Sequence, residues 1–242
     1  MEEKEKKLKK KNKIKVIPLI IVFVSILIIA LGGYLLTLIR ISNIYIKGNS
    51  YINDQEIIEQ AKLENYPSFI KTSTNTVKKR LKKNPYIKSV SVNKKLFSTI
   101  EIKIEEKKPL FRKDENKLLV LDDGKEVDDN NRYTVPILLN YVPDTKYNNF
   151  IKKMNQVDDS VKSEISEIRY YPNNQDDDRF LLNMNDGNLV YLTLTKFKQI
   201  NYYEDVLEQL DGKKGILYLD SGNHFKVMEE NELNIESEVE EK

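Results

Sequence analysis

The sequence contains no cysteine, and this absence excludes several classes of protein. Without thiols there are no disulfides, no Cys-His catalytic pairs and none of the common cysteine-ligated zinc sites. An exported domain of this composition must therefore be stable through its hydrophobic core alone. The roughly 200 residues beyond the N-terminal segment are enough to form one.

Histidine is almost absent, because His224 is the only one in the chain. A Ser-His-Asp triad would have to use His224 with a serine such as Ser221, and both lie beside Gly222 in a sequence typical of a turn. The acidic pairs and triplets lack the Asp-x-Asp-x-Asp-Gly spacing of a calcium loop, and no phosphate-binding glycine loop is present. We therefore predict no catalysis, no metal and no cofactor. The acidic groups are expected to be solvated loops: Asp122-Asp123, Asp128-Asp129, Asp158-Asp159 and 176–178.

One long hydrophobic run stands out against this polar background. Residues 16–39 form 24 uncharged positions, with Ser25, Tyr34 and Thr37 as the polar exceptions. As a helix the run is about 36 Å long, enough to cross a hydrocarbon core of about 30 Å. A cleaved signal peptide is the competing interpretation, but the run is too long and Ala30-Leu31-Gly32 is a weak cleavage site within it. We predict an uncleaved transmembrane helix.

The flanking charge predicts the orientation of this helix. Residues 1–15 carry eight lysines and three glutamates, so this basic tail is expected in the cytoplasm and the C-terminal part outside the membrane. The lysines can also contact anionic lipid heads. Beyond residue 15 there are 32 basic and 35 acidic residues, a nearly neutral balance that argues against nucleic acid as a partner.

Residues 41–110 have the pattern of a small α+β unit. A strand over 41–47 is followed by a helix that begins at Asn53, in a capping box with Glu56. A second helix is expected over 74–83, with Val77 and Leu81 facing inward. Two alternating strands follow, and their apolar positions are Val90 and Val92, then Ile100, Ile102 and Ile104. The expected order is strand, helix, helix, strand, strand, with both helices on one side of a three-stranded sheet.

This order, together with several short motifs, resembles a POTRA domain. The motifs are Ile46-Lys47-Gly48-Asn49, Asn84-Pro85-Tyr86-Ile87 and Glu106-Lys107-Lys108-Pro109. Directly after a single N-in span, the arrangement resembles the DivIB/FtsQ cell-division family. The resemblance implies a second, strand-rich β domain, and later motifs fall in its order: Leu121-Asp122-Asp123-Gly124, Val135-Pro136-Ile137-Leu138, Asn185-Asp186-Gly187 and Leu219-Asp220-Ser221-Gly222.

The residues after 110 predict a mixed domain on their own. We expect hairpins around Asp122-Asp123-Gly124 and around Asp186-Gly187, the second with Met184 facing Leu189 and Leu182 facing Tyr191. Helices are expected over 147–160 and 197–210, a strand over 165–171 and a polar loop over 173–178. A last strand is expected over 216–219, extended by 225–228, and the seven glutamates of 229–242 predict a disordered tail.

The expected organisation is thus α+β with five parts: a basic cytoplasmic tail (1–15), a transmembrane helix (16–39), a POTRA domain (41–110), a β domain (111–228) and an acidic disordered tail (229–242).

The resemblance also implies a function and a site. Members of the family gather at the division septum and bind coiled-coil single-span proteins of the DivIC/FtsB and FtsL type, and through them the septal peptidoglycan synthase. An exposed final strand could bind such a partner by strand addition. The matching positions here are Ile216, Leu217, Tyr218, Leu219, Phe225 and Val227. The alternative is a membrane-bound sensor with an extracytoplasmic ligand-binding domain.

A basic cluster near the first helices has two interpretations. It consists of Lys78, Lys79, Arg80, Lys82 and Lys83. It is either the solvated face of an amphipathic helix, or an electrostatic docking patch for anionic lipid heads, wall polymer or an acidic partner.

Overall fold

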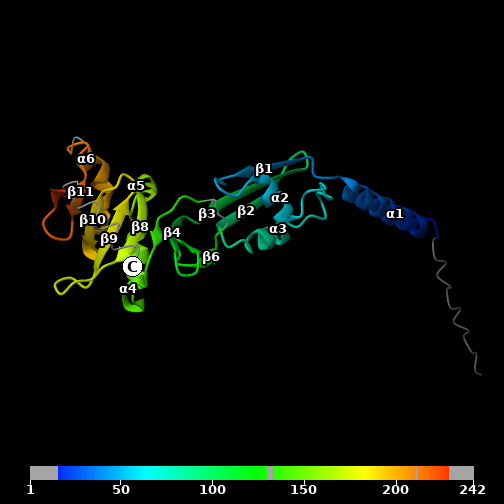
Figure 1. Ribbon diagram of the computed structural model, residues 1–242. Helices are drawn as coiled ribbons and strands as arrows, with labels where there is room; N and C mark the ends of the chain where they lie inside the picture. Colours follow the sequence, from blue (N-terminus) through cyan, green and yellow to red (C-terminus); the bar gives the residue numbers. More distant parts are fainter. Residues whose placement is uncertain (1–15, 130–132, 211, 229–242) are drawn as a thin grey trace, which may run out of the picture. The chain divides into compact units, whose positions relative to one another are not determined.

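The computed structural model describes residues 16–129, 133–210 and 212–228, so the predicted basic and acidic tails lie outside the described residues (Figure 1). The first element is α1 (Val16–Leu38), in which no side chain is buried. Within the described residues it is the one helix long and apolar enough to cross a membrane. It ends one residue before the predicted limit.

The chain divides into two compact units, one formed by residues up to 83 with 90–104 and the other by 84–89 with the residues from 105 onward. The predicted domain boundary between residues 110 and 111 remains a prediction. Both units combine helices with a sheet, so the predicted α+β class is confirmed.

The first sheet has the predicted strand, helix, helix, strand, strand order. Its strands are β1 (Asn43–Lys47), β2 (Ile87–Lys95) and β3 (Thr99–Glu106), arranged in space as β1-β3-β2. The pairing of β1 with β3 is parallel, with Ile44 opposite Ile100 and Ile46 opposite Ile102. Because the alternating isoleucines of β3 are buried, one face of this sheet forms the core.

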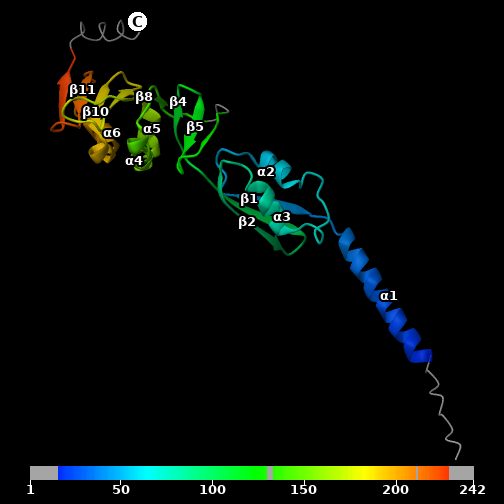
Figure 2. The ribbon, with the colours of Figure 1, turned by 90° about the horizontal axis from the view of Figure 1, so that it is seen from below.

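Helices α2 (Asp54–Ala61) and α3 (Thr74–Leu81) lie together on one side of this sheet (Figure 2). The predicted cap of α2 is confirmed, because the Asn53 side chain accepts a hydrogen bond of 2.8 Å from the Glu56 amide. Ser73 caps α3 in the same way. The helices bury Ile57 and Ala61 from α2 and Val77 and Leu81 from α3 against the sheet.

The second sheet has nine strands in the order β12-β11-β10-β9-β8-β7-β4-β5-β6. Their bounds are β4 (Pro109–Lys113), β5 (Leu118–Leu121), β6 (Glu126–Asp128), β7 (Ile137–Leu138), β8 (Ile165–Tyr170), β9 (Arg179–Met184), β10 (Leu189–Thr193), β11 (Gly215–Tyr218) and β12 (His224–Val227). The predicted hairpin of β5 and β6 is confirmed. Strands β4 and β7 were not predicted, and the short β7 joins β4 to β8 through two parallel pairings.

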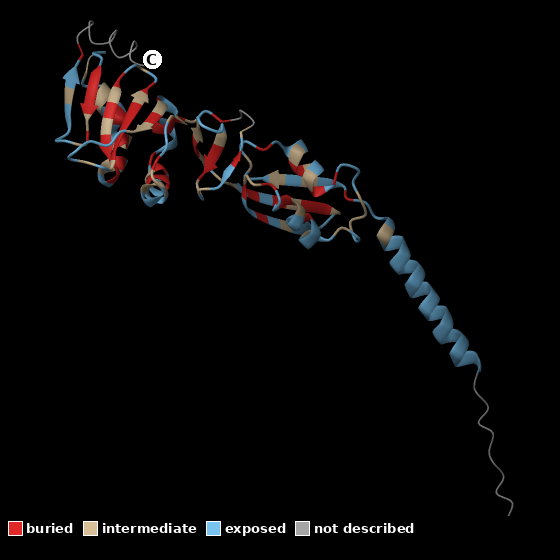
Figure 3. Ribbon diagram, turned by 60° about the horizontal axis from the view of Figure 1, so that its bottom comes forward, coloured by how far each residue is buried: buried red, intermediate tan, exposed pale blue. Residues whose placement is uncertain are grey.

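Helices α4 (Asp144–Met154), α5 (Asp159–Glu164) and α6 (Tyr203–Leu207) lie along one face of the nine-stranded sheet, with the 3₁₀ helix η1 (Leu194–Tyr202) leading into α6 (Figure 2). Four buried phenylalanines form the centre of this core: Phe111, Phe150, Phe180 and Phe197. The rings of Phe150 and Phe180 stack with centroids 4.8 Å apart. The buried residues concentrate in the inner strands, while β12 is mostly exposed (Figure 3).

Two helix predictions need correction. The helix predicted over 147–160 is two helices, because Asn155 donates to the Asp122 carbonyl at 2.8 Å and the Asp158 amide donates to Asn201 at 3.0 Å. The segment predicted as an α-helix over 197–210 is 3₁₀ helix η1 up to residue 202, and only α6 (203–207) is α-helical as predicted. Leu194, Phe197, Ile200 and Tyr203 are buried at intervals of three residues, the period of a 3₁₀ helix.

The predicted register of the β9–β10 hairpin is wrong by one residue. Leu189 lies opposite Asn183 rather than Met184, and Tyr191 opposite Leu181 rather than Leu182. The Met184 amide donates to the Asn188 carbonyl, so the loop has three residues. Gly187 has φ +88° at its end, which is the conformation that a three-residue hairpin loop requires.

Candidate functional site

The strand at the end of the nine-stranded sheet is not the one that the sequence predicted. The sequence indicated β11 as the exposed final strand, but β11 lies between β10 and β12 and pairs with both. The strand at the end is β12, which has no second strand neighbour within the described residues. The expected extension of the last strand by 225–228 is a separate strand that turns back antiparallel. The six predicted residues therefore divide between an inner strand with the turn after it (216–219) and the end strand (Phe225 and Val227), and their role in binding stays a prediction.

The backbone of β12 presents alternate groups to the outside. The Met228 amide donates to the Lys214 carbonyl at 3.0 Å, and the antiparallel register continues from this pair to Lys226 opposite Ile216 and His224 opposite Tyr218. In an antiparallel ladder only alternate residues exchange hydrogen bonds with the partner strand. The N–H and C=O groups of Phe225 and Val227 therefore point away from β11.

The predicted contact residues divide into two sets. Ile216, Leu217 and Leu219 are buried, and Leu217 and Leu219 belong to the main core, so they support the edge without being exposed on it. Tyr218 and Phe225 are half-buried, and Val227 is 49% exposed. A partner at this edge would meet Phe225, Val227 and Tyr218, because only these three of the six have accessible surface of any extent.

Asn188 fixes the position of β11 beside β10. It is 1% exposed, and its side-chain oxygen accepts a hydrogen bond of 2.8 Å from the Gly215 amide. Its side-chain nitrogen donates to the Asp186 carboxylate at 2.9 Å and contacts the Tyr203 hydroxyl at 3.0 Å. One buried amide thus links the hairpin turn, α6 and the first residue of β11, which no pattern in the sequence indicated.

Gly215 is required by the close approach of β12. A Cβ atom at this position would lie 2.2 Å from the Lys226 carbonyl oxygen and 2.6 Å from the Phe225 ring. Since real Cβ atoms do not approach a backbone oxygen so closely, only glycine lets β12 pair here with the Phe225 ring folded over the strand.

A row of aromatic side chains crosses the strands at this end of the sheet. Tyr191 stacks on Tyr218 with ring centroids 5.4 Å apart, and Tyr218 stacks on His224 at 4.7 Å. The Arg179 guanidinium lies 3.7 Å from the Tyr191 ring centroid and forms an ion pair of 2.7 Å with Asp220. The contact between Arg179 and Tyr191 was not predicted, because the predicted register placed the two side chains on opposite faces of the sheet. His224 therefore has a cross-strand stacking role.

The basic cluster is only partly a free surface. Lys78, Lys79, Lys82 and Lys83 are exposed. Arg80 instead donates to the carbonyl of Ala61 at 2.9 Å, which satisfies the C-terminal end of α2. Val77 and Leu81 face inward as predicted. The four lysines remain a candidate docking patch, while Arg80 has a structural contact.

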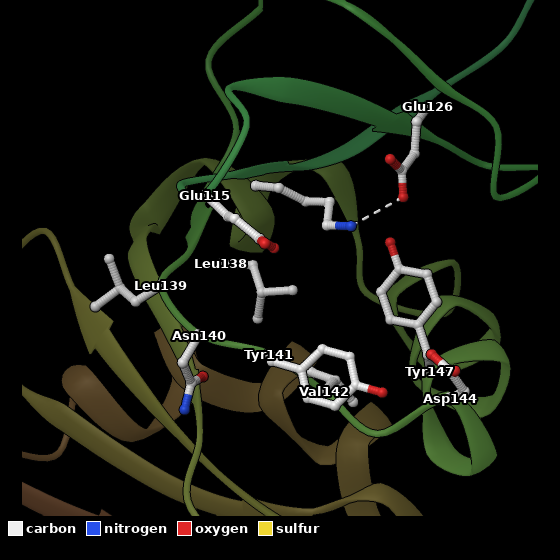
Figure 4. Close-up of a pocket in the computed structure, with 10 residues that line it drawn as sticks. Glu115, Glu126, Leu138, Leu139, Asn140, Tyr141, Val142, Asp144 and Tyr147 are labelled. Carbon is white, nitrogen blue, oxygen red and sulfur yellow. Dashed lines mark hydrogen bonds and ion pairs between the residues drawn. The ribbon is translucent and has the colours of Figure 1, made fainter.

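A surface cavity of about 470 Å³ lies beside β4, β6, β7 and the start of α4 (Figure 4). Lys113 forms an ion pair of 3.0 Å with Glu126 in it, and the same ammonium lies 5.5 Å from the Tyr147 ring centroid. Burial raises the pKa of Tyr147, so its hydroxyl stays protonated at neutral pH. Glu115 and Asp144 add two further carboxylates to the lining. The lining has no serine or histidine that could act as a nucleophile and its base.

Most of the acidic groups predicted as solvated are exposed and make ion pairs at the surface, while the Asp129 side chain is buried. Asp123 pairs with Lys107 at 2.7 Å, Asp159 with Lys108 at 2.8 Å, and Asp129 with Arg112. Lys146 bridges Asp177 and Asp178 at 2.8 and 2.6 Å, and their hydrogen bonds raise the pKa of its ammonium. Within the described ranges no three His, Cys, Asp or Glu side chains gather in a way that could hold a metal ion.

Comparisons with known proteins assign the chain to a family. The POTRA domain family of the FtsQ type matches residues 39–107. The cell division protein DivIB of Bacillus subtilis (strain 168) is 30% identical over 220 residues, which cover 87% of this chain and 82% of that protein. DivIB of Bacillus cytotoxicus is 28% identical and covers 87% of both chains, and DivIB of Listeria monocytogenes is 28% identical over 86% of this chain and 80% of its own.

A solved structure is also similar, namely the major extracytoplasmic domain of the trans isomer of DivIB from Geobacillus stearothermophilus. It has 20% identity and a TM-score of 0.37, and it covers 44% of this chain and 96% of that chain. The sequence relatives decide the assignment, because the match to the Bacillus subtilis protein extends along most of both chains. This chain belongs to the DivIB family of cell division proteins.

Proposed function

We propose that the chain is a non-catalytic, membrane-anchored scaffold of the divisome that binds coiled-coil single-span partners by strand addition at β12. Its N-terminus is cytoplasmic, its folded units are extracytoplasmic, and it acts at the division septum. The partners are of the DivIC/FtsB and FtsL type, and they link it to the septal peptidoglycan synthase. Membership of the DivIB family supports the role in division.

One observation carries the proposed mode of binding. β12 is the end strand of the second sheet, and the backbone groups of Phe225 and Val227 point away from its neighbour β11. Such groups are a template for a further strand, and main-chain hydrogen bonds supply affinity without depending on sequence. The Phe225 and Tyr218 side chains add aromatic contact area, which contributes strongly to interface energy.

Tethering makes modest contacts sufficient. If α1 and the spans of the partners share one bilayer, each binding event takes place at a high effective concentration. A four-residue edge strand can therefore hold a partner that it would bind weakly in solution.

The absence of native cysteine allows a direct test by disulfide cross-linking in membranes. The variant Val227→Cys of the full chain is paired with single cysteines placed along the exported segment of a partner. Strand addition predicts cross-links at alternate partner positions, because side chains alternate between the two faces of a strand. Tyr141→Cys, an exposed position in the same unit, is the matched control. Equal cross-linking from both positions would reject the proposed edge.

The four exposed lysines of the basic cluster are proposed as a second, electrostatic contact with an anionic surface. The variant with Lys82→Glu and Lys83→Glu should weaken partner recruitment, and the loss should shrink as salt is added, because exposed charges are screened beyond about 10 Å at 0.1 M salt. Unchanged recruitment at low salt would identify the cluster as a solvated helix face.

The ligand-binding sensor is the second candidate, and the cavity beside β4 and α4 is the observation that favours it (Figure 4). If Tyr141→Cys and Val227→Cys both fail to cross-link to any division partner, the cavity becomes the site to test. The variant Tyr141→Ala would then remove an exposed side chain from its lining without touching the core.

A further inference from the structure

The turn between β2 and β3 exposes two large apolar side chains. Leu96 is 82% exposed and Phe97 is 89% exposed. Both values exceed that of Ile17, the most exposed large apolar side chain of α1, at 74%. Neither residue contributes to a core, so the fold itself does not account for a leucine and a phenylalanine at this position.

The conformation of the turn adds a second observation. Phe97 and Ser98 have φ values of 57° and 54°, so two consecutive residues with side chains are in the left-handed region. A hairpin turn with this geometry favours asparagine and glycine, which adopt it with little strain. The turn thus holds a phenylalanine in an unfavourable conformation with its ring in solvent, and such strain is typical of functional positions.

The turn lies at the end of the sheet where the chain arrives from α1. The Ser42 amide donates to the Ser98 carbonyl at 2.9 Å, and Asn43 lies opposite Thr99 in the parallel pairing of β1 with β3. Residue 42 follows the last residue of α1, Leu38, by four positions. At a maximum of about 3.5 Å per residue, the turn lies within about 15–20 Å of the end of α1. Figure 1 shows the turn beside the segment that leaves α1.

The neighbouring loop also carries apolar side chains, Phe69 and Ile70. The Phe69 amide donates to the Ile39 carbonyl at 2.8 Å, which places this loop at the same end of the sheet. Ile70 in the loop is half-exposed, and Lys94 donates to its carbonyl at 3.2 Å while lying over the Phe69 ring. Apolar side chains beside lysine are the composition of surfaces that lie at a membrane interface.

We propose that the Leu96-Phe97 turn inserts into the interfacial layer of the bilayer that α1 crosses. The bilayer fits this surface better than a protein partner does. A stable protein interface buries about 800 Å² on each side, and two side chains on a turn bury much less than that. They are enough, however, to enter the shallow apolar layer just below the lipid head groups. A lipid surface requires no complementary shape, and the tether keeps it permanently within reach of the turn. The contact would hold the first unit against the membrane at a fixed height.

The experiment uses the full chain in proteoliposomes, where the lack of native tryptophan makes one introduced indole the only such fluorophore. The variant Phe97→Trp keeps an aromatic residue in the turn. Tyr51→Trp is the matched control, because Tyr51 is 52% exposed and follows Gly48, which packs against Ile104 at the opposite end of the sheet. Lipids brominated near the top of the acyl chains quench only indoles in contact with them.

The proposal expects at least twofold stronger quenching of Phe97→Trp than of Tyr51→Trp, with emission at shorter wavelength. Adding Leu96→Asp to the Phe97→Trp variant should reduce the quenching, because a carboxylate disfavours insertion of the turn. Equal quenching in the two tryptophan variants would overturn the proposal. Quenching that disappears when the protein is diluted in lipid would also overturn it, since the turn would then contact a second copy of the chain.

Discussion

A proline in β12 tests whether a partner binds by adding a strand to this edge. Neighbouring residues of β12 point their amides in opposite directions, so a proline can remove either an outward amide or one that bonds to β11. The Val227 amide points away from β11, whereas the Lys226 amide faces Ile216. Proline removes the amide donor and places a ring in its position. The change Val227→Pro therefore alters the free edge, and Lys226→Pro alters the β11–β12 pairing.

The expected magnitudes follow from the hydrogen bonds involved. Val227→Pro leaves a carbonyl of an added strand without its donor, which costs about 1–3 kcal/mol, or about 5- to 150-fold in Kd. Its effect on folding should stay below about 1 kcal/mol, since proline is tolerated on the open side of an edge strand. Lys226→Pro removes a bond within the sheet and should cost about 1–3 kcal/mol of folding free energy.

The assay is a titration of the full chain in nanodiscs with the exported segment of a coiled-coil partner, and thermal melting by circular dichroism runs in parallel. We expect Val227→Pro to lose affinity at unchanged melting temperature, and Lys226→Pro to lower the melting temperature. If Val227→Pro binds as tightly as the unmodified chain, strand addition at β12 is refuted. Leu217→Pro is unsuitable for this test because Leu217 is buried in the main core.

Three further outcomes are expected at the same end of the sheet. Asn188→Ala leaves the buried Gly215 amide without its acceptor and should lower the free energy of unfolding by about 1–3 kcal/mol in a urea titration; a loss below about 0.5 kcal/mol would contradict the linking role of this amide. Gly215→Ala should force β12 away from β11 and speed amide hydrogen exchange in β12 while β9 stays protected, and uniform protection of both strands would contradict it. Burial raises the pKa of the Tyr203 hydroxyl above its ordinary value of 10, so this group stabilises the fold fully below about pH 10 and loses that contribution as the pH rises through the raised value. Tyr203→Phe should therefore flatten the alkaline loss of stability in melting curves recorded from pH 8 to 12, and an unchanged slope would assign that loss to other groups.

Much of the first unit could be predicted from local sequence patterns. The long apolar run predicts α1, and Asn53 with Glu56 marks the start of α2, because a helix cap depends on residues within one turn of each other. The alternation of Ile100, Ile102 and Ile104 predicts a strand with one buried face. The family resemblance, which rests on the order of such elements, was confirmed by the comparisons.

The features that the sequence missed depend on contacts between distant residues. The hairpin register was wrong because Asp186-Gly187 suits a two-residue and a three-residue loop alike, and only the Met184–Asn188 hydrogen bond distinguishes them. This one-residue shift also concealed the contact between Arg179 and Tyr191.

The sequence by itself determined the number and type of most elements, their order and the apolar span, because propensity, capping and hydrophobic period act over a few neighbouring residues. Only the tertiary structure decided which strand is at the edge. β11 and β12 are similar short segments, and β11 becomes an inner strand because Asn188, 27 residues earlier, binds its first amide and places it beside β10. Strand order depends on such long-range bonds, which leave no periodic pattern in the sequence.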